Sequence, residues 1–308
     1  MRTNVLINKI RLGMSLPNIE NRFSDSTLLE LANDEIQSSI LPWLFSLRED
    51  YLISTEEYDL TTIENGVIDF PQYSSGRTLK DLWVSEDQKA YRPLQRIGLD
   101  EAWRFNENEI DVPHAFSVQG DRIYLHRKPS VNTVGVLRLY YHVLPNTLVG
   151  VSRGITIASV SGDDTLTVDA VPTFMSSGVN LDIIYNTPDY QIFLRGQTIA
   201  STTSTTITFA GYSPTNTLAD AGYASGLIVC LSGETIETPL PIEVNQLLIQ
   251  AVIIRVLESM NAPQQLSLAL ERFSRLKTQL RDILTPRSEN RLLKFRPTYP
   301  FLRNQRVL

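Results

Sequence analysis

The stretch IEVNQLLIQAVIIRVLESMNAPQQLSLALERFSRLKTQLRDIL, residues 242–284, decides the fold. In its first half, apolar residues recur at steps of three and four and also fill the other faces, which predicts a central, almost fully apolar helix. Pro263 lacks an N–H group and disfavours helical geometry at Ala262, so the helix breaks there. The second half predicts a helix that Pro286 ends, with basic residues on one side. Its apolar side comprises Leu266, Ala269, Leu270, Phe273, Leu276, Leu280 and Ile283.

A helical partner for this pair is predicted near the other end of the chain. Residues 24–51 carry an apolar stripe at helical spacing, and Thr27 and Glu30 fit a capping box. Pro42 interrupts the stripe and predicts a kink or split near Ser38. We therefore expect an α+β fold whose helical core, residues 23–53 and 239–285, is a bundle assembled from both chain ends.

Residues 1–22 are interpreted as an N-terminal arm. Val5 and Ile7, then Ile10 and Leu12, give two short apolar alternations that are out of phase with each other. One interpretation is a poorly ordered terminus or an edge strand, and the other is a segment that orders against a neighbouring subunit.

Between the two helical regions the apolar period changes to two, which is typical of strands. Residues 54–148 are predicted to form a β-rich region, clearest at 122–126 and 136–141. From 149 to 238 Thr, Ser, Gly, Val and Ile dominate, and a hairpin is indicated where residues 155–158 and 165–168 flank a Ser-Gly-Asp-Asp turn. This second region is predicted to be an inserted antiparallel barrel or sandwich.

The bulk properties exclude several classes of protein. The chain has 308 residues and a net charge of −6, so its total charge does not argue for nucleic-acid affinity. One cysteine, Cys230, rules out an intrachain disulfide and is expected to be an inert core thiol. No apolar run approaches the roughly 20 residues needed to cross a bilayer, so no membrane partner is expected. The N-terminus lacks a signal-peptide core.

The final segment, residues 286–308, differs from the rest. It holds six basic residues against the single acid Glu289, a net +5, which leaves −11 for the remainder (22 basic against 33 acidic). Prolines keep it extended, and its Arg and aromatic residues are typical of a docking peptide. A tail wrapped on its own domain and single-stranded nucleic-acid binding are the alternatives, the latter disfavoured by the acidic remainder. The candidate docking residues are Arg287, Arg291, Leu293, Phe295, Arg296, Tyr299, Phe301 and Arg303.

The sequence predicts no catalytic, cofactor-binding or metal-binding residues, and we expect a protein that is not an enzyme. The three histidines lack metal-ligand spacing, and no P-loop or nucleophile elbow is present. Asp163, Asp164 and Asp169 fit a solvated turn better than a cation site, because no EF-hand pattern surrounds them. An enzyme would need a pocket that joins His126 or His142 to an acid such as Asp121.

Several short segments follow one another in a characteristic order: residues 31–35 (LANDE), 41–44 (LPWL), 47–51 (LREDY), 139–141 (LYY), 239–241 (PLP) and the basic tail after Pro286 and Arg287. In these segments and their order the chain resembles the head-to-tail connector (adaptor, or head-completion) proteins of tailed bacteriophages. The resemblance covers most of the chain as an order of elements. Many relatives begin almost at once with the first helix, so residues before Ser24 receive no role from the resemblance. The β insertion also exceeds that of the smaller family members.

The resemblance implies a structural virion protein at the portal vertex, made in the host cytoplasm. It implies a ring of about a dozen copies whose tail docks on the portal protein, with a tail or nozzle protein, and in some systems fibres, as further partners. Genomic DNA would pass through the lumen without specific binding.

A ring also needs two different contact surfaces on each subunit. Opposite charges could set their register. The candidate subunit contacts are Asp34, Glu35, Glu49 and Asp50 on one side and Arg272, Arg275, Lys277 and Arg281 on the other. The rival hypothesis is a virion surface or fibre-attachment module, in which the Thr/Ser-rich insertion binds a receptor or glycan.

Overall fold

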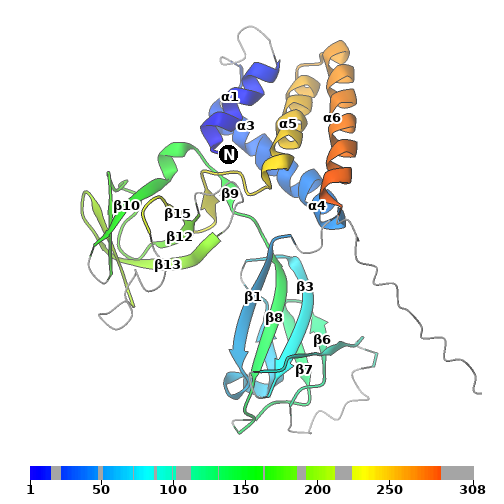
Figure 1. The fold of residues 1–308 in the computed structure, drawn as a ribbon, viewed down its shortest axis with the longest axis vertical. Coiled ribbons are helices and arrows are strands. Elements are labelled where there is room, and N and C mark those ends of the chain that lie inside the picture. Colours follow the sequence, from blue (N-terminus) through cyan, green and yellow to red (C-terminus); the bar gives the residue numbers. More distant parts are fainter. Residues whose placement is uncertain are drawn as a thin grey trace, which may run out of the picture.

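The computed structural model describes residues 1–14, 22–47, 51–71, 73–86, 89–98, 100–101, 112–130, 132–161, 164–185, 192–211 and 224–285. These residues form an α+β fold with three parts (Figure 1). Helices from both ends of the chain lie together at one end of the molecule, and two sheets lie at the other end. A closed barrel lies to one side.

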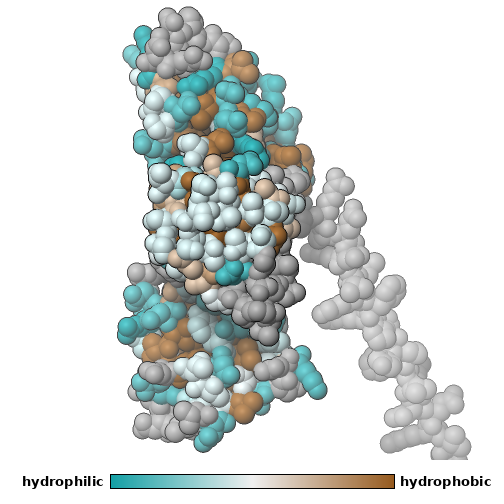
Figure 2. Space-filling view, turned by 90° about the vertical axis from the view of Figure 1, so that its left-hand side faces the viewer, coloured by the Kyte–Doolittle hydropathy of each residue, from teal (hydrophilic) through white to brown (hydrophobic). Residues whose placement is uncertain are grey.

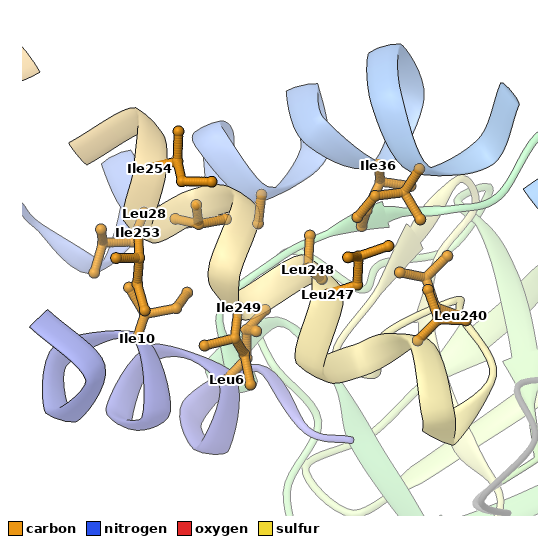
Figure 3. Close-up of a cluster of buried hydrophobic side chains, with 14 of the residues drawn as sticks. Leu6, Ile10, Leu28, Ile36, Leu240, Leu247, Leu248, Ile249, Ile253 and Ile254 are labelled. Atoms are coloured by element: carbon orange, nitrogen blue, oxygen red, sulfur yellow. The ribbon is translucent and has the colours of Figure 1, made fainter. Parts of the chain in front are cut away.

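The helical part is built around α5, which contacts α1, α3 and α6. Its apolar residues are buried on nearly every face, as the sequence predicts, and Figure 3 shows Ile249 and Ile253 meeting Leu6 and Ile10 of α1. The predicted break is also confirmed, since α6 begins at Pro263. The α-helices are α1 (Thr3–Met14), α3 (Asp25–Glu35), α4 (Leu41–Leu47), α5 (Asn245–Ser259) and α6 (Pro263–Leu284).

The interpretation of the first residues as a poorly ordered terminus or an edge strand is wrong for residues 1–14. Residues 3–14 form α1, which buries Leu6, Ile7, Ile10 and Met14 against the helical core. The strand interpretation relied on Val5 and Leu12, yet these side chains are 41% and 77% exposed. Apolar residues occupy enough positions here to fit both the two-residue period of a strand and the roughly 3.6-residue period of a helix. Burial against α5 favours the helix.

The second predicted helix is interrupted where Pro42 requires it. Residues 36–40 form a single π-helical turn between α3 and α4. Proline cannot donate a hydrogen bond to the carbonyl four residues earlier, and its ring crowds that carbonyl. The wider π-helical turn accommodates the missing hydrogen bond and relieves the clash. The predicted capping box is wrong, because α3 begins one turn earlier, with the Ser24 Oγ accepting a hydrogen bond from the Thr27 N–H at 3.2 Å.

Two sheets enclose a second hydrophobic core below the helices. The first has the order β1-β8-β3-β4 and the second β2-β7-β6-β5. Strand β8 alternates strictly between half-buried and buried residues, so one face of the first sheet points outward and the other toward Phe116, Ile123 and Leu125 of the second. The strands are β1 (Ile53–Asp59), β2 (Val67–Asp69), β3 (Ser74–Ser85), β4 (Arg92–Pro93), β5 (Gln95–Arg96), β6 (Ala115–Gln119), β7 (Arg122–His126) and β8 (Val136–Val143).

The third part settles the choice between a barrel and a sandwich. Six strands close in the order β10-β11-β14-β13-β12-β15, and the predicted hairpin is β10–β11. Apolar side chains such as Leu181, Ile199 and Phe209 fill the interior, so the barrel is a packed core. The strands are β10 (Ile155–Ser161), β11 (Thr165–Val168), β12 (Asn180–Ile184), β13 (Ile192–Thr202), β14 (Thr206–Phe209) and β15 (Ile228–Leu231).

A short parallel ribbon joins the barrel to the helices. It pairs β9 (Thr147–Leu148) with β16 (Glu234–Thr235), the segments that enter and leave the barrel. The Asn33 side chain of α3 bonds to the backbone of Leu148, which attaches the ribbon to the helical core. None of the described helices combines the length and apolar content needed to cross a membrane.

Candidate functional site

The first candidate contact surface lies on α3. Asp34 is exposed, as is Glu30 one turn earlier, and we call these two residues the acidic α3 face. Glu35, predicted to belong to the same surface, instead points inward: its side chain is 7% exposed and forms an ion pair with Arg255 of α5. Successive helical residues differ by about 100° in direction, so Asp34 and Glu35 cannot share one face. Glu49 and Asp50 lie outside the described residues.

The second candidate surface lies on α6. Arg272, Arg275 and Arg281 are exposed, and Arg275 pairs with Glu271 at 3.0 Å. Lys277 is half-buried instead, with its ammonium 5.8 Å from the centre of the Trp43 ring.

The buried stripe of α6 is narrower than predicted. Ala269, Leu280 and Leu284 are buried, whereas Leu270 and Ile283, expected on the buried side, are 47% and 66% exposed. The helix packs mainly on α5 and leaves its remaining surface to solvent. Leu268, Arg272, Arg275 and Ile283 follow one another at steps of four, three and eight residues, and we call this stripe the α6 outer face.

These two surfaces belong to two helices that flank α5. Figure 1 shows α5 between α3 and α6, and both helices contact it. The acidic α3 face and the partly apolar, basic α6 outer face are therefore carried by helices on opposite sides of α5. The predicted docking tail, from Arg287 to Arg303, lies outside the described residues.

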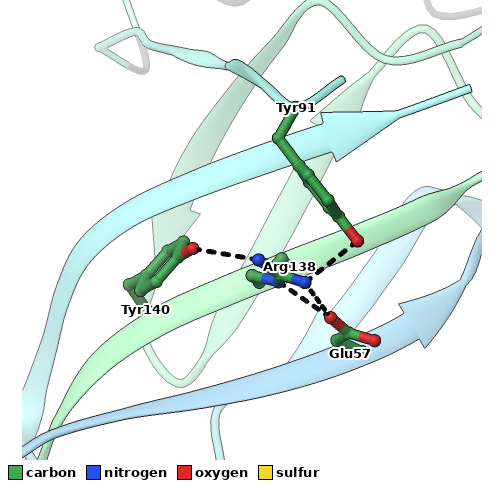
Figure 4. Close-up of polar contacts among 4 residues, drawn as sticks. All are labelled: Glu57, Tyr91, Arg138 and Tyr140. Atoms are coloured by element: carbon green, nitrogen blue, oxygen red, sulfur yellow. Dashed lines mark hydrogen bonds and ion pairs between the residues drawn. The ribbon is translucent and has the colours of Figure 1, made fainter. Parts of the chain in front are cut away.

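The outer face of the first sheet carries a cluster that the sequence analysis missed. In Figure 4 Arg138 of β8 meets Glu57 of β1, Tyr91 and Tyr140. The Arg138 Nε donates to Glu57 Oε1 at 2.8 Å, and its guanidinium lies 4.0 Å from the centre of the Tyr91 ring. Hydrogen bonds to Tyr140 and Glu57 raise the pKa of Arg138. Trp83 packs edge-on against Tyr140, with ring centres 6.0 Å apart.

Strand register explains why these residues gather and why sequence inspection alone could not find them. Arg138 lies opposite Glu57 on one side and Trp83 on the other, so three strands distant in sequence contribute to one row. The alternation of β8 indicated that Arg138 and Tyr140 share a face, but their neighbours depend on pairing. We call Glu57, Trp83, Tyr91, Arg138 and Tyr140 the aromatic sheet face.

A buried carboxylate in the barrel was also missed. Asp182 of β12 is fully buried and accepts four hydrogen bonds, from Asn146 Nδ2, the Gly196 N–H, Ser232 Oγ and the Gly233 N–H, at 2.8 to 3.0 Å. Because the Ser232 hydroxyl has one proton and gives it to Asp182, the Tyr73 hydroxyl, 2.8 Å away, donates to Ser232.

This network links two parts of the molecule. Tyr73 belongs to the two-sheet part, Asp182 and Ser232 to the barrel, and Arg195 of β13 stacks 4.5 Å from the Tyr73 ring centre. Arg195 also donates to the Leu144 carbonyl at 3.0 Å. A carboxylate with this many donors from separate segments acts as a structural joint.

The histidines have local structural partners. His126 is buried with its Nε2 2.9 Å from Ser117 Oγ, and His142 Nδ1 lies 3.3 Å from the Tyr51 carbonyl oxygen. Among the described residues, no group of three or more His, Cys, Asp or Glu side chains is arranged to hold a metal ion. Cys230 is buried, as expected, and burial raises its pKa to about 12.

The described surfaces that remain as candidates are thus the acidic α3 face, the α6 outer face and the aromatic sheet face. All three consist of charged, aromatic or exposed apolar side chains, most of them on helices or strands, which suits contact with macromolecules. No protein-family model and no curated protein matches the sequence.

Proposed function

We propose that this chain is a structural virion protein of a tailed bacteriophage that forms a ring of about a dozen copies between the capsid portal and the tail. The observation that carries the proposal is the position of the acidic α3 face and the α6 outer face on opposite sides of α5. A ring closes through head-to-tail contacts between two different surfaces, and these two differ in charge.

Charge and exposed apolar groups have separate parts in such a contact. Leu268 and Ile283 are 57% and 66% exposed, and burying them against a neighbour supplies hydrophobic stabilisation. Asp34 opposite Arg272 or Arg275 sets the register of the two copies more than it adds affinity.

The basic tail, residues 286–308, is proposed to reach the portal, and tail or nozzle proteins and fibres are proposed to join below. The net charge of −11 outside this tail supports a lumen through which DNA slides, because like charge prevents phosphates from binding. A ring structure with a channel lined by Lys and Arg would contradict this part of the proposal.

The ring is tested by native mass spectrometry and class-averaged electron micrographs of the full chain, alone and mixed with portal protein. A closed ring in either sample supports the proposal, and a lone subunit in both overturns it. Asp34→Arg and Arg275→Asp should each reduce ring formation at least several-fold, and combining them should restore part of it. Arg122→Asp, on an exposed strand residue away from α3 and α6, is the matched control.

The tail assignment is tested by deleting residues 286–308. The truncated chain should keep the circular dichroism spectrum and the cooperative thermal unfolding of the full chain but no longer pull down portal protein. Normal assembly on portals by the truncated chain would show that docking occurs elsewhere.

One observation favours the rival attachment function. Among the described residues of 155–231, Asp169 is the one exposed charged side chain, and most of the exposed residues are Ser, Thr, Ala or Gly. Figure 2 shows this side of the molecule with a largely pale middle region, where residues are neither strongly hydrophilic nor strongly hydrophobic. A neutral surface of short side chains pays little conformational entropy when it binds. A monomeric or trimeric protein that binds glycan or receptor through this barrel would support attachment over the connector.

A further inference from the structure

The aromatic sheet face has the composition of a protein-binding surface. Trp83, Tyr91, Arg138 and Tyr140 are all half-buried on the side of the sheet that points away from its core. Trp, Tyr and Arg are the residue types that dominate binding energy at interfaces. The ion pair with Glu57 and the stacking of Tyr91 fix Arg138 in advance, which reduces the entropy lost on binding.

This face is also acidic. The β1–β8–β3 register brings Glu57, Asp59 and Asp81 to the same side of the sheet as Arg138. Three carboxylates against one guanidinium give a net charge of −2. Asp59 and Asp81 are exposed and lie in the rows on either side of Arg138, so the face favours an occupant that combines positive charge with groups that stack on aromatic side chains.

The chain contains one segment with this chemistry. Residues 296–300 read Arg-Pro-Thr-Tyr-Pro, within a tail of net charge +5. Two prolines three residues apart match the three-residue turn of a polyproline II helix, which presents both rings on one side. Polyproline II segments of this P-x-x-P type are recognised by aromatic surfaces.

The tail starts close enough to reach the face. α6 ends beside α4, as Lys277 over the Trp43 ring and the buried Leu284 indicate, and Figure 1 shows this end above the β1–β8–β3 sheet. Phe45 of α4 packs on His142 at the upper end of β8, 4.8 Å between ring centres. Arg138 is four residues further down, roughly 13 Å along the strand. The twelve residues 286–297 span about 37 Å as polyproline II, more than this distance.

We propose that, in the free subunit, the Arg296–Pro300 segment binds the aromatic sheet face of its own chain. The proline rings stack on Trp83 and Tyr140, and Arg296 pairs with the exposed carboxylates. The tail residues assigned to the portal include Arg296 and Tyr299, so the tail cannot bind the portal and the aromatic sheet face at the same time. In this respect alone the inference rests on the proposed function. Portal protein would then compete with the sheet for the tail.

Photocrosslinking in the full chain tests this inference without any portal protein. Tyr299 is replaced by p-benzoylphenylalanine, the protein is irradiated when dilute, and the products are mapped by mass spectrometry. We expect crosslinks within one chain to peptides that contain Trp83 or Tyr140. The same-chain assignment would be overturned if crosslinks formed only to other elements or if no crosslinks formed. Products of twice the chain mass would overturn it as well.

Two sets of variants make the result specific. Pro297→Ala with Pro300→Ala should reduce the crosslink at least fivefold, and these changes lie outside every described helix and strand. Tyr140→Ala should reduce it similarly, whereas Tyr124→Ala, which removes a half-buried tyrosine from the second sheet, should leave it unchanged. Equal yields in all variants would overturn the proposal. A ring that still docks on portal would leave the proposed function standing.

Discussion

The side-chain amide of Asn33 pairs with both backbone polar groups of Leu148. The Leu148 N–H donates to Asn33 Oδ1 at 2.8 Å, and Asn33 Nδ2 donates to the Leu148 carbonyl at 3.1 Å. Asn33 thus behaves as one residue of an additional strand beside the β9–β16 ribbon, although it belongs to a helix. Through this pair the helical core holds the segment that enters the barrel.

Asn33→Asp should destabilise the protein by about 1–3 kcal/mol, because a carboxylate keeps the acceptor but loses the donor to the Leu148 carbonyl. Urea unfolding measures the loss, and faster hydrogen exchange at the Leu148 amide reports the local opening. Asn33→Ala should cost a similar amount. Asp34→Ala, at the exposed neighbouring position, should change stability by less than about 0.5 kcal/mol. Equal effects at 33 and 34 would contradict the role given to the amide pair.

Asp182→Asn should destabilise the barrel and loosen its joint with the two-sheet part. The asparagine amide replaces one acceptor oxygen by a donor, so at least one buried donor among Asn146, Gly196 and Gly233 loses its partner, at a cost of about 1–3 kcal/mol. Thermal unfolding measures the cost, and small-angle scattering detects a wider range of orientations. Asp169→Asn, on an exposed barrel residue, is the control, and a melting temperature equally insensitive to both changes would argue against the joint.

Glu35→Gln and Glu271→Gln compare a buried with an exposed ion pair. Glu35 is nearly buried beside Arg255, and removal of its charge should cost about 1–3 kcal/mol. Glu271 and Arg275 are both more than 60% exposed, so loss of that pair should cost about 0–0.5 kcal/mol. Chemical denaturation of both variants in one buffer compares their losses of unfolding free energy. A larger loss for Glu271→Gln than for Glu35→Gln would contradict the prediction.

Leu268→Ser with Ile283→Ser should leave the stability of the subunit unchanged within about 0.5 kcal/mol, because both side chains are already exposed. The same change should weaken ring formation if the α6 outer face contacts a neighbour. Leu280→Ser, at a residue 6% exposed, should instead cost about 2–5 kcal/mol of folding free energy. Melting curves and native mass spectra separate the two effects, and unaltered rings with the double serine variant would remove α6 from the contact.

Cys230 should stay unreactive until the cluster that buries it, with Ile184, Ile228 and Ile236, opens. Burial raises the pKa of its thiol from 9.0 to about 12, so the folded state holds the proton more tightly than the unfolded state. This contribution is neutral below about pH 9, and stability falls as pH rises from about 9 toward 12. Alkylation by iodoacetamide at pH 8, followed by mass spectrometry, should be slow and should accelerate with urea. Fast alkylation of the folded protein would contradict the burial.

Much of the fold could be predicted because the strongest patterns were long. The stretch from Ile242 to Leu284 is periodic over many turns and has a proline at its break, and the hairpin at residues 155–168 has a polar turn between β-branched runs. Helix α1 was not predicted, because its twelve residues carry apolar side chains at many positions and so fit the period of a helix as well as that of a strand. Only the surface of α5 against which Leu6 and Ile10 pack decides between them.

The candidate surfaces were predictable only in part. Exposed charges such as Asp34 and Arg275 follow from helical spacing, whereas the inward direction of Glu35 depends on Arg255, 220 positions away. Asp182 sits in an apolar strand, where a carboxylate is costly unless it is saturated with donors, and those donors come from three distant segments. Long-range pairing of this kind leaves no local signal.

The barrel's closure has a consequence for how folded chains behave when they are concentrated. A sheet that ends in an unpaired strand offers backbone groups on which another chain can add a strand and so begin to aggregate. In the order β10-β11-β14-β13-β12-β15 each barrel strand already has two neighbours, so crowded copies cannot exchange or extend strands there. Whatever meets this part of the molecule has to recognise side chains, and copies gathered at high local concentration remain separate folded units.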